Sequence, residues 1–234
     1  MNLQGRNQAT AKQAILDRMA AIEAAVADLR DKALSFPRYE ETQTEAFQNR
    51  LQNRILTVAL FLTHLEDVAR RLVRRLGYDP AEVSRSVEAS IALKILRRLA
   101  NSWKHGLGGK RSDGAVLNGM LMVQRRRGSD HAELEPNATV HVLGMLVADS
   151  NNGACPSSTV IEIAIRHWGT ILSSRIPEAT DWASRCVPNA KSPDIQLKSD
   201  GANVVPLGST VVAKLPAEII ETFSKETRRR ITES

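Results

Sequence analysis

The chain contains few of the residues that build metal sites, disulfide frameworks or aromatic binding surfaces. Two of its 234 residues are cysteines, Cys155 and Cys186, and their separation matches no zinc-ligand spacing. We therefore expect no metal ion or other cofactor, and two unpaired thiols are typical of a reducing compartment. Aromatic residues make up 4% of the chain, which disfavours carbohydrate-binding clefts and extended base-stacking surfaces because both need exposed rings.

Long hydrophobic runs are also missing. The longest, over residues 58–62, is far shorter than the roughly 20 apolar residues that cross a bilayer. The N-terminal residues contain no apolar signal segment. These absences predict a cytoplasmic protein without a membrane partner.

Basic residues exceed acidic ones, with 32 Lys and Arg against 26 Asp and Glu, which gives a net charge of +6. Much of this excess is local. Between Arg70 and Arg111 the chain has eleven lysines and arginines but only three acidic residues. Solubility explains a modest overall charge, whereas a local excess favours an anionic partner such as nucleic acid.

Apolar residues in the first part of the chain recur at steps of three and four, the spacing of a buried helix face. They predict helices over residues 9–34 and 41–76, the second ended by Gly77. Asp79–Pro80 is typical of a helix start, so a third helix is expected from there to Gly106. Long helices joined by short connections indicate an antiparallel bundle.

The pattern changes after the third helix. Residues 115–124 and 139–148 are rich in Val, Leu and Met between polar spacers, and predict two strands of a small antiparallel sheet. A turn over residues 149–153 and a fourth helix, capped by Ser157 or Ser158, are expected to follow.

Prolines are frequent between residues 176 and 206, which predicts a loop. A short strand pair over residues 204–213 and a last helix from Pro216 to an arginine triplet at Arg228–Arg230 are expected after it.

Together these elements predict a mainly α fold of the α+β kind. Residues 1–110 form an antiparallel helical bundle, and residues 111–175 form a β-hairpin and a helix that pack on it. Residues 176–234 form a loop-rich C-terminal segment that ends in a helix and belongs to the same domain or to a small lobe.

Polar residues line one side of the third predicted helix near its end. Arg98, Asn101 and His105 follow one another at steps of three and four residues, so a rotation of about 100° per residue places them on one face. Lys94 extends this row by one turn. An apolar stripe beside the row is expected to face the bundle core, and it consists of Ile91, Ile95, Leu99 and Trp103. The polar row is therefore expected at the lip of a groove between helices.

Such a row suits phosphoryl transfer on RNA. Arginine binds a phosphate with two hydrogen bonds, histidine acts as general acid or base near neutral pH, and asparagine orients the imidazole or binds a phosphate oxygen. No metal is needed when the ribose 2′-hydroxyl is the nucleophile. The candidate catalytic residues are Arg98, Asn101 and His105, and the candidate nucleic-acid-binding residues are Lys94, Arg97, Lys104, Lys110 and Arg111.

The segment Arg98-Leu-Ala-Asn-Ser-Trp-Lys-His105 resembles the R-x4-6-H motif of the HEPN superfamily of helical proteins. The resemblance covers about residues 41–175. It implies an RNA-binding protein or a metal-independent endoribonuclease of a toxin–antitoxin or phage-defence system. It also implies a homodimer and a protein partner, an antitoxin or defence component. One departure is Leu99, which stands where active members commonly have a polar residue.

A longer pattern, Arg-x-x-Ala-Asn-x-x-Lys-His from Arg97 to His105, is similar to a stretch in a set of uncharacterised bacterial proteins. In those proteins a strand pair, a turn and a helix with a tryptophan tend to follow. Trp168 fits that position here.

Structural interpretations of the same residues stay open. Lys104 and His105 lie in the last helical turn, where positive charge stabilises the helix dipole by about 0.3–1 kcal/mol. Asn101 can hydrogen-bond within its own helix or to a neighbouring one. The chain would then be a non-catalytic adaptor or oligomerisation module. Binding to a specific DNA sequence is a third possibility, although no helix-turn-helix is evident.

The other histidines have no partners at ligand spacing. His64 lies in an apolar helical stripe and is interpreted as an interfacial residue. His141 alternates with valines, which predicts the outward face of a strand.

Overall fold

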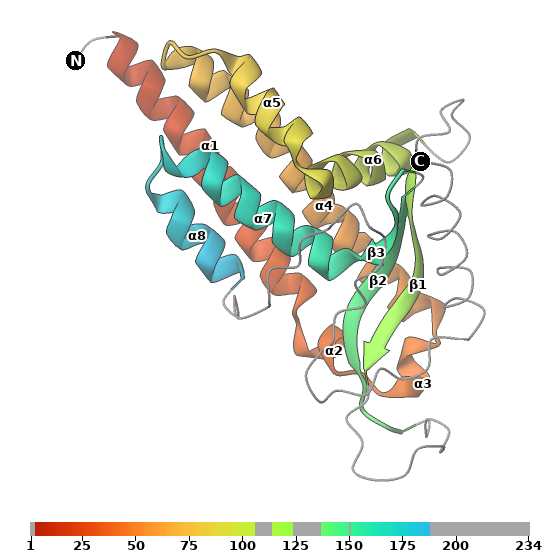
Figure 1. Cartoon of the computed structure of the whole chain (residues 1–234). Coiled ribbons are helices and arrows are strands. Elements are labelled where there is room, and N and C mark those ends of the chain that lie inside the picture. Colours follow the sequence, from red (N-terminus) through yellow and green to blue (C-terminus); the bar gives the residue numbers. More distant parts are fainter. Residues whose placement is uncertain (1–2, 106–113, 124–136, 150, 188–234) are drawn as a thin grey trace.

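The computed structural model describes residues 3–105, 114–123, 137–149 and 151–187 (Figure 1). In chain order its elements are α1 (Leu3–Leu29), α2 (Lys32–Ser35), α3 (Tyr39–Thr42), α4 (Glu45–Arg75), α5 (Pro80–Ala89), α6 (Ile91–His105), β1 (Ala115–Val123), β2 (His141–Asp149), β3 (Gly153–Pro156), α7 (Ser157–Ser173) and α8 (Glu178–Cys186). Helices dominate the described residues, and a small antiparallel sheet accompanies them. The predicted mainly α fold is therefore confirmed.

Helices α1 and α4 lie side by side at the centre of the bundle (Figure 1). The apolar stripe predicted for the first helix is confirmed, since Ile15 and Ile22 are fully buried. Both predicted helices have different limits. Asp31 caps the separate short helix α2, and α4 begins one turn later than predicted because the Thr44 side chain accepts a hydrogen bond from the Phe47 N–H.

The end of α4 confirms the predicted helix stop. Gly77 adopts φ 82°, a left-handed conformation that suits glycine, and the following Tyr78 N–H donates to the Val73 carbonyl at 3.0 Å. The next boundary is also confirmed, because the Asp79 side chain accepts from the Ala81 N–H at 2.9 Å and caps α5.

The prediction of one continuous third helix is wrong, because the chain changes direction at Ser90 between α5 and α6. Ser90 has extended backbone angles, φ −95° and ψ 113°, and its hydroxyl accepts from the Leu93 N–H at 3.4 Å. It therefore ends one helix and caps the next. The apolar spacing through Val83, Val87 and Ile91 continues across the break, so periodicity does not reveal it.

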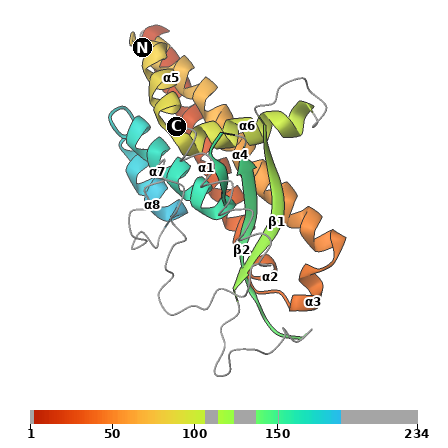
Figure 2. The same ribbon diagram turned by 45° about the vertical axis from the view of Figure 1, so that its right-hand side comes forward.

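The three strands form one antiparallel sheet in the order β1-β2-β3. The first two confirm the predicted pair, with Ala115 opposite Asp149 at one end and Val123 opposite His141 at the other. The third strand was not predicted, because its four residues are too few to show alternation. Figure 2 shows the sheet against the α4 side of the bundle, with α6 at one end and α2 and α3 at the other.

Helix α7 is held against α4 by Trp168, which is fully buried and donates its indole N–H to the Leu62 carbonyl at 3.1 Å. The predicted serine cap is wrong. Pro156 occupies the cap position, and the Ser157 hydroxyl accepts instead from the Met145 N–H at 3.0 Å. A Cβ at Gly144 would lie 2.5 Å from that hydroxyl, so this approach of strand to helix requires glycine.

Helix α8 corrects the prediction of a loop after residue 176. Pro177 caps the helix, and Ala179, Trp182 and Cys186 form its buried face. The Trp182 indole N–H donates to the Met19 carbonyl at 2.9 Å, which anchors α8 on α1. Proline favours a loop when it interrupts a helix, whereas here it stands at the helix start, where it is well tolerated.

A single hydrophobic cluster joins helices and sheet, from Ala11 on α1 to Val187 after α8. None of the helices among the described residues is long and apolar enough to cross a membrane. The strand pair predicted over residues 204–213 and the last helix from Pro216 lie outside the described residues.

Candidate functional site

Arg98, the arginine of the RNA-directed motif, is bound within the protein. Its Nε donates to Asp149 Oδ1 at 2.6 Å and its Nη2 donates to Oδ2 at 2.8 Å. The Asp149 side chain is fully buried, and that of Arg98 is 19% exposed. This paired geometry is the one by which a guanidinium binds a carboxylate or a phosphate. The Nε–Nη2 edge of this guanidinium, which was proposed as a phosphate ligand, is therefore already occupied by an internal anion.

Asp149 also holds the turn between β2 and β3. Its Oδ2 accepts from the backbone N–H groups of Asn151 and Asn152, at 3.3 Å and 2.9 Å, and from Asn152 Nδ2 at 2.6 Å. A fully buried carboxylate is tolerated only when its charge and its lone pairs are satisfied. Arg98 supplies the opposite charge, so the ion pair fixes the sheet to α6.

The other polar residues of this part of α6 lie at or near its surface. Asn101 is exposed, as is Lys104, and Lys94 is half-buried on the same side of α6. The backbone of His105 ends α6, and its side chain lies outside the described part of the structure. The structure therefore places Asn101 in the predicted row with Lys94, whereas the Arg98 of that row is paired with Asp149.

Trp103 corrects one assignment in the apolar stripe. Ile95 and Leu99 are buried as expected, whereas Trp103 is 53% exposed. Helical spacing predicted its direction but not its burial, because the last turn of α6 extends beyond the packed core.

Arg97 is the second motif arginine that is engaged inside the protein. Its Nη1 lies 2.6 Å from Glu88 on α5, and its Nη2 lies 3.8 Å from Glu66 on α4. Glu66 also accepts from the Ser84 hydroxyl at 3.2 Å. This cluster ties three helices together, so Arg97 does not join the exposed row. Lys110 and Arg111 lie outside the described residues.

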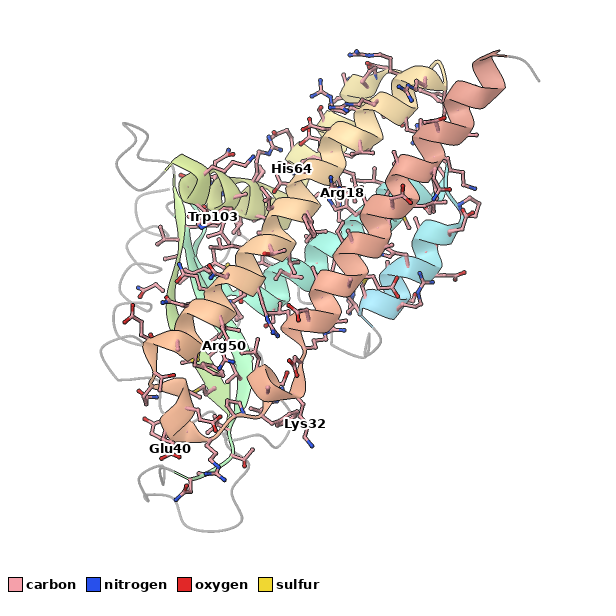
Figure 3. The ribbon with its side chains drawn as sticks, turned by 180° about the vertical axis from the view of Figure 1, so that it is seen from behind. Arg18, Lys32, Glu40, Arg50, His64 and Trp103 are labelled. Atoms are coloured by element: carbon pink, nitrogen blue, oxygen red, sulfur yellow. The ribbon has the colours of Figure 1, made fainter. Side chains whose placement is uncertain are left out.

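Lys104 reaches from α6 to α4, where its Nζ lies 3.1 Å from His64 Nε2. The lysine donates, so the imidazole accepts and is neutral in this contact. Burial, followed by the charges of Lys104 and Arg18, lowers the pKa of His64 below its ordinary value of 6.5, and Asp67 opposes this in part. Figure 3 shows His64 and Arg18 on neighbouring helices, with Trp103 near the end of α6.

Four arginines lie close together in the last two turns of α4: Arg70, Arg71, Arg74 and Arg75. All four are exposed, and none has an ion-pair partner among the residues that the structure describes. At about 100° per residue they span one side of the helix, opposite the buried Leu72. The local charge excess pointed to this region, but the site residues chosen from the motif did not include it.

These arginines continue the surface that begins at the α4–α6 contact. Arg71 and Arg75 follow His64 by seven and eleven residues, so they lie on its side of α4, about 10 Å and 16 Å further along the axis. We call Arg70, Arg71, Arg74 and Arg75 together with Lys104 the basic face. It offers several guanidinium groups and an ammonium group to one extended anion.

The described residues give less support to a cysteine nucleophile, a metal site or a small-molecule pocket. Burial raises the pKa of the Cys155 and Cys186 thiols to about 12, so neither is a ready nucleophile. No group of three His, Cys, Asp or Glu side chains in the described ranges could hold a metal ion. A cavity of about 190 Å³ between α1, β2 and α7 is smaller than the roughly 300–1,000 Å³ of most small-molecule sites.

Comparison of the chain with protein-family models, with curated proteins and with solved structures finds no match. The described geometry provides a surface that can bind a polyanion, and it holds the motif arginine in an internal ion pair.

Proposed function

We propose that the protein binds RNA through the basic face, and that Arg98 stabilises the fold rather than the RNA. The observation that carries this proposal is the set of four exposed arginines on two turns of α4, without ion-pair partners among the described residues. Each such cation can neutralise a phosphate and release its counterion, which favours binding.

Several other arginines at the surface have intramolecular partners. Arg54 pairs with Asp28 at 3.0 Å, Arg175 with Glu82 at 2.8 Å and Arg185 with Glu23 at 2.8 Å. Arginines with an internal partner have less to gain from an external anion. The four of the basic face repel one another, and an anionic ligand relieves that repulsion.

The motif resemblance favours RNA over other polyanions, because the HEPN superfamily includes many proteins that act on RNA. Cleavage by Arg98 and His105 is the second candidate function, and the motif itself is what favours it. To bind the Nε–Nη2 edge of Arg98, a phosphate has to displace Asp149 and leave a buried carboxylate without its charge partner. Binding on the basic face requires no such displacement.

Fluorescence anisotropy with labelled RNA at several salt concentrations tests the proposal. The variant Arg71→Gln/Arg75→Gln should bind more weakly, and its salt slope should fall by about 0.7 for each phosphate that the variant no longer neutralises. A matched control is Lys32→Gln/Arg50→Gln, which removes two exposed charges near the other end of α4 (Figure 3). Equal decreases of affinity in both variants would show that the basic face is not the binding site.

The cleavage candidate needs a separate assay. RNA incubated with the protein in EDTA should stay intact if the protein only binds it. A cyclic-phosphate product that disappears in the His105→Ala variant would instead establish the second function. Light scattering of the free protein and of the complex tests the homodimer that the resemblance implies.

A further inference from the structure

The exposed indole of Trp103 distinguishes one edge of the basic face. The other two tryptophans, Trp168 and Trp182, are fully buried and donate their indole N–H groups to backbone carbonyls. Trp103 is 53% exposed, on the last turn of α6. The chain therefore presents one of its three tryptophans to solvent.

The other exposed aromatic residues have partners that Trp103 lacks. Phe36 stacks on His141 with ring centroids 4.7 Å apart, and Tyr78 lies under Arg175 at 5.0 Å. Within the described ranges, no ring or cation covers Trp103. Neither face of its indole is thus committed to an aromatic or cationic contact with described residues.

Trp103 stands beside an exposed basic residue in the last turn of α6. Lys104 is the next residue, and its ammonium group lies 3.1 Å from His64 on α4. A protein interface over the indole would also approach the charged Lys104, whereas a nucleic acid would place a base on the indole and a phosphate near the ammonium group.

We infer that the basic face binds single-stranded RNA and that Trp103 stacks on one of its bases. This inference rests on the proposed function. The bases of a single strand are open to stacking on an aromatic side chain, whereas those of a duplex are already stacked inside the helix. One stacked base contributes about 5- to 100-fold in affinity and requires no particular sequence. The low aromatic content of the chain is consistent with one such contact rather than a row of them.

The test compares a labelled oligouridine with a blunt-ended RNA duplex of equal strand length, by anisotropy at fixed salt. Trp103→Ala should weaken oligouridine binding by about 5- to 100-fold and leave duplex binding within about 2-fold. Trp103→Phe should restore most of the affinity, because a phenyl ring still stacks. Oligouridine should also quench the tryptophan emission of the wild type, and this quenching should be absent from Trp103→Phe. Thermal melting followed by circular dichroism confirms that the variants fold.

Unchanged oligouridine binding by Trp103→Ala, or equal decreases for both RNAs, would overturn the inference. So would a concentration-dependent blue shift of the emission without RNA, because a second copy of the chain would then cover the indole. The same measurements distinguish failure of the proposed function from failure of this inference alone. In the first case Arg71→Gln/Arg75→Gln binds both RNAs as the wild type does, whereas failure of the inference alone leaves this variant impaired.

Discussion

Arg98 and Arg71 carry the same guanidinium group on adjacent helices and are used in opposite ways. Arg98 is bound to a fully buried carboxylate at 2.6 Å and 2.8 Å. Arg71 is exposed and has no ion-pair partner among the described residues. The difference shows that the residue in a recognisable motif can be structural while an arginine outside it is available to a ligand.

The largest expected effect is on stability at the internal pair. Arg98→Ala should lower the free energy of unfolding by about 3–5 kcal/mol, because it leaves the buried Asp149 carboxylate without a charge partner. Chemical denaturation followed by circular dichroism measures this decrease. Arg71→Ala, the matched change on the basic face, should alter stability by no more than about 0.5 kcal/mol. Similar decreases in the free energy of unfolding for Arg98→Ala and Arg71→Ala would contradict a structural role that is specific to Arg98.

The second expected effect is on RNA binding. Here changes to the basic face should matter more than a change at Arg98, the reverse of their effects on stability. Changing all four arginines of α4 to glutamine should abolish most of the salt-dependent RNA affinity while the protein stays folded. Arg98→Lys, assayed at a temperature at which it is folded, should bind RNA as the wild type does. Titration by anisotropy checks both. A large decrease of affinity in Arg98→Lys alone would assign RNA binding to the motif.

A smaller effect is expected at His64, which lies between the two helices of the basic face. Its pKa is lowered by burial, by Lys104 and by Arg18. The unfolded chain therefore takes up this proton at a higher pH than the folded protein does. The contribution of neutral His64 to the free energy of unfolding is therefore fully present above about pH 6.5. It is lost as the pH falls through the lower pKa of the folded protein. Bound phosphates favour the imidazolium, so RNA should raise this pKa.

Proton NMR of the His64 ring, titrated with and without RNA, measures that shift. A pKa that stays the same when RNA is bound would place the phosphates away from the α4–α6 contact. His141 provides an internal control, because it lies on β2 and its lowered pKa is caused by burial.

The smallest effect concerns the thiols, which extend the contrast between buried and exposed groups. Burial raises the pKa of Cys155 and Cys186 to about 12, so few thiolates form at about pH 8. We expect slow reaction of the native protein with Ellman's reagent and rapid release of two equivalents after denaturation. Rapid labelling of the native protein would contradict the buried positions of these residues.

Much of the fold was predictable because it depends on local periodicity and caps. The buried stripe of α1, the glycine stop at Gly77 and the cap at Asp79 all follow from neighbouring residues. The break at Ser90 was missed because the same apolar spacing runs through both helices. The short elements β3 and α8 were missed because four to nine residues give little periodic signal.

The candidate site was less predictable because it depends on distant contacts. Arg98 and Asp149 are 51 positions apart, and nothing local to either residue indicates their pairing. The exposure of Trp103 depends on where the core ends, which helical spacing does not specify. The arginines of α4 were visible as a charge excess, and their spacing of one and four residues could have placed them on a single outer face.

An NMR titration of the arginine Nε–H groups with oligouridine distinguishes the internally paired arginine from those proposed to bind RNA, within one sample. The Arg98 Nε–H donates to Asp149 at 2.6 Å, so its signal should exchange slowly and stay in place as RNA is added. The signals of Arg71 and Arg75 should exchange fast in the free protein and become shifted and protected in the complex. A shift of the Arg98 signal while the two α4 signals stay unchanged would contradict RNA binding on the basic face.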